Sequence, residues 1–157
     1  KQIAGITAII IMFLTACGQQ TTPKQTKYPI NKSDTEWKKL LSPSAFEIMV
    51  KRGTEPAYQN PYFNNHQKGT YVSAATGEPL FSSDDKFDSG TGWPSFTKPI
   101  DSKAVMVVKD NSFGMSRDEV VEAKTGLHLG HVFDDGPRDK GGLRYCMNSA
   151  ALKFIKK

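Results

Sequence analysis

Cysteine is scarce in this chain of 157 residues, which contains only Cys17 and Cys146. Cys17 ends a hydrophobic leader, so Cys146 is the one thiol left for the remainder of the sequence. A single thiol excludes an internal disulfide and a structural metal site made of four thiolates. If Cys146 takes part in chemistry, it must act alone and be returned to its reduced form by a molecule from outside.

Long apolar runs are also few, and the clearest extends from Ile3 to Leu14 after a basic first residue. About a dozen residues are too few to cross a bilayer, which takes roughly 20. A basic start followed by a short apolar core is typical of a secretory signal. The alternatives are a plain signal without lipidation and a buried hydrophobic helix with an incidental cysteine.

The end of this leader, residues 14–18, resembles the lipobox of bacterial lipoproteins. The resemblance implies that residues 1–17 are a lipoprotein signal peptide and that Cys17 is the lipidated residue. Two acyl chains anchor a protein much more firmly than one. We therefore expect an exported protein, held by its lipid at the bacterial membrane on the cell-envelope or extracytoplasmic side.

Charge of one sign is not concentrated anywhere, although the formal net charge is +5. Basic and acidic residues are interspersed, and no basic stripe alternates with aromatic residues, so nucleic acid is not an expected partner. Residues 18–33 are polar, contain Pro23 and Pro29, and show no apolar period, which indicates a flexible tether. Residues 34–157 are enough for one domain.

Two short helices are predicted at the start of this domain. Ser33 followed three residues later by Glu36 is typical of a capping box, and apolar residues then recur at helical spacing up to Leu41. Ser42-Pro43 should end this helix and begin a second one, which ends near Gly53.

Short β-prone runs, separated by Gly and Pro, make up the rest of the domain. Strands are expected at residues 69–73, 79–81, 104–108, 119–122, 128–133 and 143–148, with a turn at 109–112. The pattern predicts a mainly β fold, with antiparallel sheets in a tent-like or barrel-like arrangement behind the N-terminal helices.

The last of these strands carries Cys146. Alternation along it places Arg144, Cys146 and Asn148 on one face, and turns Tyr145 and Met147 toward the core. A neighbouring cation lowers the pKa of a thiol, and an amide can donate to an oxygen of a substrate. However, a lone cysteine on a strand is more often a small buried apolar residue, so this strand alone does not decide its role.

Two further segments carry groups suited to a site. His128 and His131 lie three residues apart, but a metal site would need more ligands than one thiol and His66 can add. Either histidine can supply a proton or a hydrogen bond beside Cys146, or both rings are purely structural. Trp93, in the turn-rich residues 88–96, is either a core residue or the wall of a small apolar pocket.

Taken together, residues 86–96, 128–133 and 144–152 resemble the methionine sulfoxide reductase B family, and the likeness extends over roughly residues 35–155. The resemblance implies thiol-dependent reduction of the R epimer of methionine sulfoxide in proteins or peptides, a repair of oxidative damage. It implies that Cys146 attacks the sulfoxide sulfur and becomes a sulfenic acid.

The same resemblance implies the remaining site residues. His131 and Asn148 would position the sulfoxide oxygen and help to protonate it, and Arg144 would stand beside the nucleophile. Trp93 would pack on the substrate methyl group. The other residues expected at the substrate are Phe133, His128, Glu119, Asp135 and His66.

The sequence departs from the family in three respects. The positions of two zinc-binding cysteine pairs hold Ser73, Thr76, Glu122 and Thr125, so we expect neither zinc nor another cofactor. Thr91 stands where some members have a resolving cysteine, so reduction must come from an external thiol, such as a thioredoxin-like protein or dithiothreitol. Val121 replaces a common arginine, which weakens the expected network around Glu119.

Two other functions remain open at this point. The chain could be a lipoprotein that binds oxidised peptides with little turnover, or a thiol redox sensor whose Cys146 is oxidised by peroxide. The partners expected from the leading hypothesis are oxidised proteins, a thioredoxin-like reductant and the membrane reached through the lipid, with the protein itself a monomer.

Overall fold

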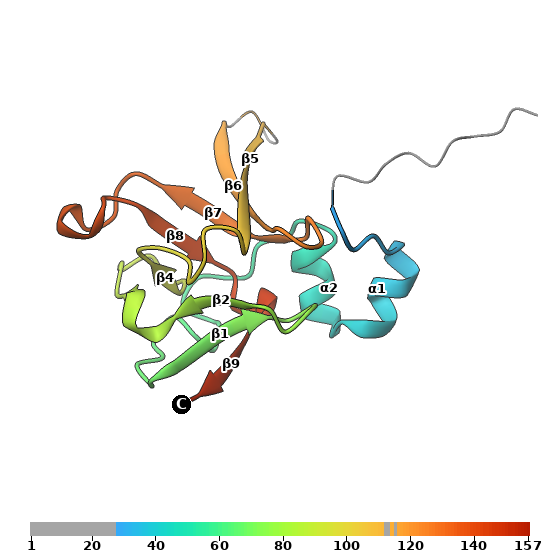
Figure 1. Cartoon of the computed structure of the whole chain (residues 1–157), viewed down its shortest axis with the longest axis horizontal. Helices are drawn as coiled ribbons and strands as arrows, with labels where there is room; N and C mark the ends of the chain where they lie inside the picture. The colour runs from blue at the N-terminus through green and yellow to red at the C-terminus, as the bar shows by residue number, and fades with distance from the viewer. Residues whose placement is uncertain (1–27, 112–113, 115) are drawn as a thin grey trace, which may run out of the picture.

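The computed structural model describes residues 28–111, 114 and 116–157. Figure 1 shows two short helices beside a body of strands. The elements are α1 (Asp34–Leu40), α2 (Pro43–Met49), β1 (Gly69–Ser73), β2 (Pro79–Ser82), η1 (Ser83–Asp85), β3 (Lys86–Phe87), β4 (Ser95–Phe96), β5 (Val105–Asp110), β6 (Arg117–Glu122), β7 (His128–Phe133), η3 (Arg138–Lys140), β8 (Arg144–Met147), η4 (Ser149–Ala151) and β9 (Leu152–Lys156).

Both helices begin where the sequence predicts. The Ser33 side chain accepts from the Glu36 backbone, and the Glu36 carboxylate accepts from the Ser33 backbone N–H at 2.8 Å, which completes the capping box. The Ser42 hydroxyl caps α2, with Pro43 in its first turn. Helix α2 ends at Met49, earlier than the expected end near Gly53.

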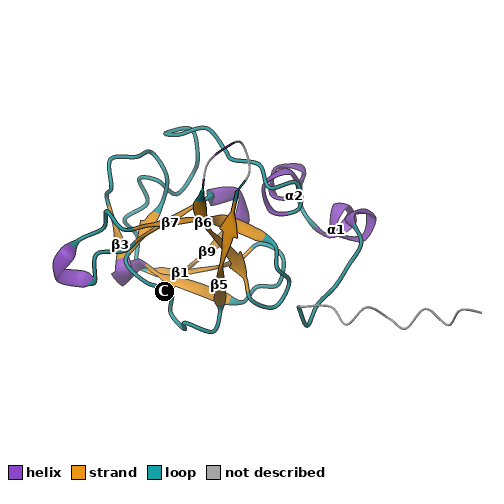
Figure 2. Ribbon diagram, turned by 90° about the horizontal axis from the view of Figure 1, so that it is seen from above, coloured by secondary structure: helices purple, strands orange, loops and turns teal. Residues whose placement is uncertain are grey.

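The strands form two antiparallel sheets, as the mainly β prediction requires. One sheet has the order β2-β1-β9, and the other has the order β3-β4-β8-β7-β6-β5. Figure 2 shows the strands grouped together with α1 and α2 to one side. The larger sheet brings β4 beside the consecutive strands β8 and β7, although β4 is distant from them in sequence.

Aromatic side chains from both sheets build the core. Phe81 of β2 stacks on Phe96 of β4 with ring centroids 4.6 Å apart, and Tyr71 of β1 meets Phe96 edge-on at 5.0 Å. Such pairs add about 0.5–1.5 kcal/mol beyond the area that they bury. Tyr145 packs on Phe81, and Met147 is fully buried, so the core-facing side of β8 is the one expected.

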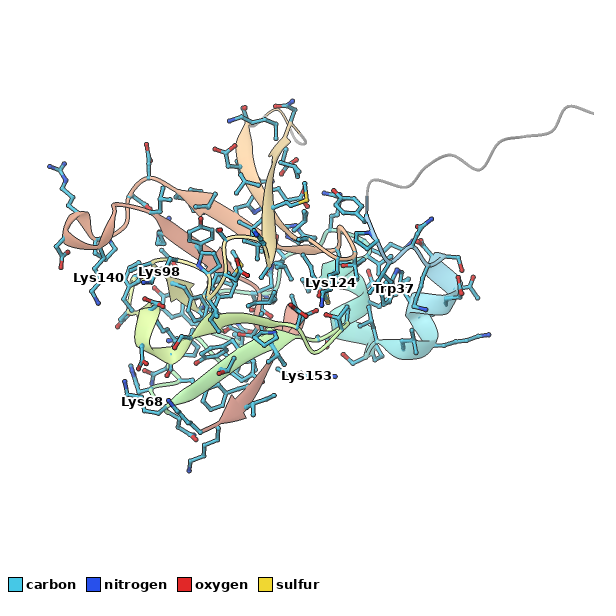
Figure 3. All side chains as sticks on the ribbon, viewed as in Figure 1. Trp37, Lys68, Lys98, Lys124, Lys140 and Lys153 are labelled. Atoms are coloured by element: carbon cyan, nitrogen blue, oxygen red, sulfur yellow. The ribbon has the colours of Figure 1, made fainter. Side chains whose placement is uncertain are left out.

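Helices α1 and α2 cover one end of this core. Trp37, labelled in Figure 3, and Phe46 are both buried, and α2 contacts β7 and η4. The lysines labelled in the same figure lie on separate parts of the molecule, in keeping with the interspersed charge of the sequence. No helix in the part of the chain covered by the structure is long and apolar enough to cross a membrane.

Some boundaries differ from the sequence expectations. Strand β5 continues through Asp110, so the expected turn at 109–112 was wrong for its first two residues. Asn148 lies just past β8, at the start of η4, rather than on the strand. The short strands β3 and β4 and the final strand β9 were not predicted.

The described residues of the predicted tether, 28–33, contact the domain. The Ile30 N–H donates to the Lys124 carbonyl at 2.8 Å, and the Ile30 side chain packs against the core. The Tyr28 ring lies so close to Gly126 that a Cβ there would be 2.2 Å from it. Residues 28–33 are therefore attached to the domain, and the leader with Cys17 lies outside the described residues.

Candidate active site

Cys146 occupies the centre of three hydrogen-bonded strands. It lies opposite Ser95 of β4 on one side and opposite His131 of β7 on the other. Directly opposite residues on an antiparallel pair present their side chains on the same face. The close fit of β7 on β8 depends on Gly130, because a Cβ there would be 2.1 Å from the Cys146 carbonyl oxygen.

A cavity of about 140 Å³ opens on this face. Five of the expected site residues line it: Cys146, Trp93, His131, Phe133 and Asn148. The other lining residues are Thr54, Arg117, Gly130 and Met147. Its aromatic and aliphatic walls suit a small apolar group, with the thiol, an imidazole and a guanidinium as the polar contacts.

The thiol of Cys146 is largely buried, and its environment contains opposing effects. Burial raises the pKa of the thiol, while the Arg144 charge and contacts with Thr91 and Ser95 lower it, and the net shift is upward. Thr91, Ser89 and Ser95 form a linked cluster of hydroxyls, at 2.8 Å and 2.7 Å. Cys146 is therefore mainly a neutral thiol at neutral pH in the empty site.

Arg144 is fixed beside the thiol by a pair of hydrogen bonds to the Asp135 carboxylate. Its Nε and Nη2 each donate to an oxygen of Asp135 at 2.8 Å, and its guanidinium lies 4.4 Å from the centre of the Phe133 ring. The hydrogen bonds from Arg144 hold the pKa of Asp135 below its usual value. Asp135 was expected at the substrate, but its side chain is largely exposed. It contacts Arg144 and does not line the cavity.

His131 faces the cavity and is held from β5 and β6. Its Nε2 lies 3.0 Å from Asp110 Oδ2, which also accepts from Arg117 at 2.8 Å. Burial lowers the pKa of His131, and the Arg117 charge adds to this effect, while the hydrogen bond with Asp110 opposes it. The Nε of Arg117 is buried with no hydrogen-bond partner among the described residues.

Glu119 and His128 lie behind the cavity and not on its surface. Both are buried, and His128 Nδ1 lies 2.8 Å from Glu119 Oε1. Arg52, which follows α2, donates through Nη1 to both oxygens of Glu119. The cation of this network is therefore Arg52, and the apolar Val121 is fully buried in the core nearby.

Asn148 connects this buried pair to the cavity. Its Oδ1 accepts from the Glu55 N–H at 3.1 Å, which fixes the orientation of the amide. Its Nδ2 donates to the Leu129 carbonyl at 3.1 Å and lies 3.5 Å from His128 Nε2. The second amide hydrogen thus meets only a long contact, and it is the one that a substrate oxygen can share.

Trp93 is placed by a tight turn in residues 88–96. Gly92 adopts a φ of 87°, and a Cβ there would be 2.7 Å from the Tyr58 ring, so a side chain would not fit. The Trp93 indole N–H donates to the Glu55 carbonyl at 3.0 Å. Trp93 is thus a wall of the cavity and not a core residue.

His66 is the expected site residue that the structure places elsewhere. It is exposed, its Nε2 lies 2.7 Å from Asn64 Oδ1, and it borders a separate depression with Lys68 and Lys86. The structure does not bring His66 to the cavity of Cys146, because the loop before β1 carries it to a separate depression.

Comparison with known proteins agrees with this geometry. A family model described as the SelR domain matches residues 41–156. The chain belongs to the SelR domain family. A curated relative, the peptide methionine sulfoxide reductase MsrB of Leptospira interrogans serogroup Icterohaemorrhagiae serovar Lai (strain 56601), is 54% identical over 129 residues, which are 82% of this chain and 98% of the relative.

Three residues of this SelR domain site were missed from the sequence. Arg117 precedes Glu119 by two residues, so strand alternation would have placed both on one face. Thr54 lies within the Gly53-Thr54-Glu55 segment that belongs to the resemblance, but no chemistry was assigned to it. Arg52 has no local signal at all, because its partner Glu119 lies far along the chain.

The four positions of the absent cysteine pairs do come together in this SelR domain. Glu122 is fully buried, and its two oxygens accept from the hydroxyls of Thr76 and Thr125, the latter at 2.7 Å. The Ser73 hydroxyl accepts from the backbone of the same turn. Three hydroxyls and an already bonded carboxylate do not fit zinc, which prefers sulfur and nitrogen ligands.

Proposed function

We propose that the protein reduces the R epimer of methionine sulfoxide, in peptides or proteins, to methionine by using Cys146 as the nucleophile. Its family membership and the 54% identical MsrB make it an oxidoreductase of the peptide-methionine (R)-S-oxide reductase type. The observation that carries the proposed mechanism is the cavity shared by Cys146, Trp93 and His131.

The cavity suggests how the substrate is held. The methyl group of the sulfoxide packs against Trp93 and Phe133, which supply the apolar wall. The sulfur then faces the Cys146 thiol, and the oxygen faces the polar groups of His131 and Asn148. The positive edge of this site, from Arg144 and Arg117, favours an anionic thiolate and a polarised S–O bond.

In the first step the Cys146 sulfur attacks the sulfoxide sulfur as the oxygen is protonated. The S–S bond formed in the attack and the S–O bond of the substrate both break as the protonated oxygen passes to Cys146, and the products are methionine and a Cys146 sulfenic acid. The Cys146 sulfur is oxidised by two electrons, and the substrate sulfur is reduced by two. Because Cys146 rests mainly as a thiol, its own proton can be passed to the oxygen through His131.

In the second step an external thiol returns Cys146 to its reduced form. One thiol displaces water from the sulfenic acid to form a mixed disulfide, and a second thiol releases Cys146 and leaves as a disulfide. Cys146 is the one cysteine within the described residues, and Thr91 contributes a hydroxyl beside it. A thioredoxin-like protein in the cell, or dithiothreitol in the test tube, would supply both thiols.

The test uses separated R and S epimers of a blocked methionine sulfoxide, with dithiothreitol as the reductant. We expect methionine to form from the R epimer alone, and Cys146→Ser to abolish its formation. The matched control is Ser149→Ala, which removes a neighbouring hydroxyl outside the cavity and should retain most turnover. Turnover by a folded Cys146→Ser protein would overturn the proposal.

We also propose that Cys17 is lipidated and that the protein acts at the cell envelope in repair of oxidised proteins. Support comes from the short apolar leader and from the residues around Cys17. Labelling cells with a radioactive fatty acid should mark the parent protein and leave a Cys17→Ala variant unlabelled and off the membrane. Equal labelling of the two proteins would contradict a lipid at Cys17.

A further inference from the structure

A strained backbone residue supports the buried carboxylate behind the site. Arg52 adopts a φ of 58°, in the left-handed region that side chains other than glycine avoid. Such a backbone conformation is strained for a residue with a side chain. Glycine would adopt this conformation without strain, so the presence of arginine indicates that its side chain is used.

The Arg52 side chain crosses from the end of α2 to β6. The turn is tight, because the Gly53 N–H donates to the Glu47 carbonyl at 3.0 Å, and a Cβ at Gly53 would approach that oxygen to 2.9 Å. The turn directs the Arg52 guanidinium at Glu119, whose side chain is 3% exposed. An uncompensated carboxylate at such a depth would be costly.

The contact continues from Glu119 to the cavity through two further side chains. A carboxylate only accepts hydrogen bonds, so the 2.8 Å contact with His128 Nδ1 requires the proton on Nδ1. Nε2 of His128 is then an acceptor, and it faces the amide nitrogen of Asn148 at 3.5 Å, which is a donor. The charge on Glu119 thus determines which way the His128 proton lies.

We infer that Arg52 is a positioning residue of the active site: by pairing with Glu119, it holds His128 in the neutral tautomer that accepts from Asn148. A proton taken up by the Glu119–His128 pair goes to the imidazole, the stronger base of the two, so that Nε2 becomes a donor as well, and the Arg52 charge opposes this uptake. Two donors then face each other across the 3.5 Å contact, and the Asn148 amide is displaced from the sulfoxide oxygen. The activity measurements that test this inference rest on the proposed function, whereas the spectroscopic measurement does not.

The surrounding charges are consistent with this role. Glu119 is faced by Arg52 from the segment after α2, by His128 and His131 on β7, and by the apolar Val108 on β5. Burial raises the pKa of Glu119, but hydrogen bonds from His128 and Arg52 and the Arg52 charge outweigh it and hold the pKa below its ordinary value.

The experiment compares Arg52→Gln, Arg52→Lys and Arg52→Gly with the parent. We expect Arg52→Gln to lower kcat/KM for the R sulfoxide by about tenfold, with the loss greatest at acid pH. Its activity should fall as pH decreases and the Glu119–His128 pair takes up a proton, at a higher pH than in the parent, because the opposing charge of Arg52 is gone. Arg52→Lys should recover most of the activity, because only Nη1 contacts Glu119 and an ammonium can replace it.

Arg52→Gly separates positioning from folding. It removes the ion pair but relieves the strained φ, so we expect its stability to stay near that of the parent while its activity falls like that of Arg52→Gln. The charge control is Lys51→Gln, which loses the neighbouring cation and its exposed contact with Asp34 and should retain parental activity and pH profile.

A readout independent of turnover is the ¹⁵N spectrum of His128, which distinguishes protonated from unprotonated ring nitrogens. The parent should show its proton on Nδ1 alone at neutral pH, and Arg52→Gln should gain a second proton on Nε2 at a higher pH than the parent does. An unchanged tautomer together with an unchanged pH profile in Arg52→Gln would overturn the inference. Absence of turnover in the parent would instead refute the proposed function and leave the spectral test intact.

Discussion

Two buried glutamates on β6, Glu119 and Glu122, are stabilised in different ways. Glu119 has a cation, Arg52, and a titratable partner, His128, and this chain of contacts ends at the cavity. Glu122 accepts from two threonine hydroxyls and joins the β1–β2 turn to the β6–β7 turn. The same residue type therefore serves a site with a charged partner in one place and a cross-link between sheets made by hydroxyl donors in the other.

The difference shows why the ionic network lies near the chemistry. An ion pair with a histidine can change its state when a proton arrives, whereas hydroxyl donors on Thr76 and Thr125 have no second charge state near neutral pH. Variants of the two glutamates should accordingly change different properties, one mainly stability and the other mainly activity.

The largest effect is expected from Glu122→Ala. Removing this carboxylate leaves the Thr76 and Thr125 hydroxyls without their acceptor inside the fold and opens a small cavity, at a cost of about 3 kcal/mol in the free energy of unfolding. Urea unfolding measures the loss, with the exposed Glu47→Ala as control. Activity per folded molecule should stay within about twofold of the parent. A loss of turnover without a matching loss of stability would show that Glu122, like Glu119, supports the active site, and would contradict the prediction.

A smaller loss of stability, about 2 kcal/mol, is expected from Glu119→Gln, together with a drop of about tenfold in kcat/KM. The glutamine amide can donate to His128 Nδ1 and so favours the wrong tautomer. Because the pKa of Glu119 is lowered from 4.5 in the folded protein, its stabilisation is complete above the unfolded value and is lost as pH falls through the folded value. The difference in unfolding free energy between parent and variant should therefore narrow in acid.

If the difference in unfolding free energy is instead the same from neutral to acid pH, the charge of Glu119 does not contribute to stability. Glu119 and Glu122 would then not differ in how they stabilise the fold. The Glu122→Ala protein serves as the reference in this comparison, because it should lose much stability while the contacts of Glu119 with Arg52 and His128 remain.

The smallest effect is expected on the resting thiol. Arg144 is the strongest of the groups that lower the pKa of Cys146, so Arg144→Met should raise this pKa further above its ordinary value. Alkylation by iodoacetamide, measured against pH in a Cys17→Ala background, should then be slower at pH 8 than in the parent. The exposed Lys140→Met controls for net charge, and equal alkylation curves would show that Arg144 has no electrostatic effect on the thiol.

Much of the fold could be predicted because its signals are local. The capping box of Ser33 and Glu36 lies within one turn of α1, and the strands at 69–73 and 128–133 match β1 and β7 in both bounds. Strands β3 and β4 were missed because two residues are too short to show alternation. Strand β9 was missed because Phe154 and Ile155 are adjacent, so its apolar residues do not alternate strictly with the lysines.

The site was predictable to the extent that it depends on β7, β8 and the Trp93 loop. Cys146, His131, Trp93, Phe133 and Asn148 all line the cavity. The role of Arg52 was not predictable, because its contact with Glu119 joins segments distant in sequence. Its left-handed backbone conformation was not predictable either, because arginine is not a residue type that favours this conformation. His66 was misplaced because a resemblance in sequence does not fix the direction of a loop.

Residues 28–30 are attached to the β6–β7 turn, so a force that pulls on the N-terminal segment acts on the domain at this turn. Tension applied along the N-terminal segment would reach the fold first at the hydrogen bond between Ile30 and Lys124. It would pass next to the turn that holds Thr125 and Glu122, where two sheets are joined and can share the force. Strands β4 and β8, which carry Ser95 and Cys146, are separated from β6 by β7 in the larger sheet, so a pull on the N-terminal segment would reach them from this turn only through β7.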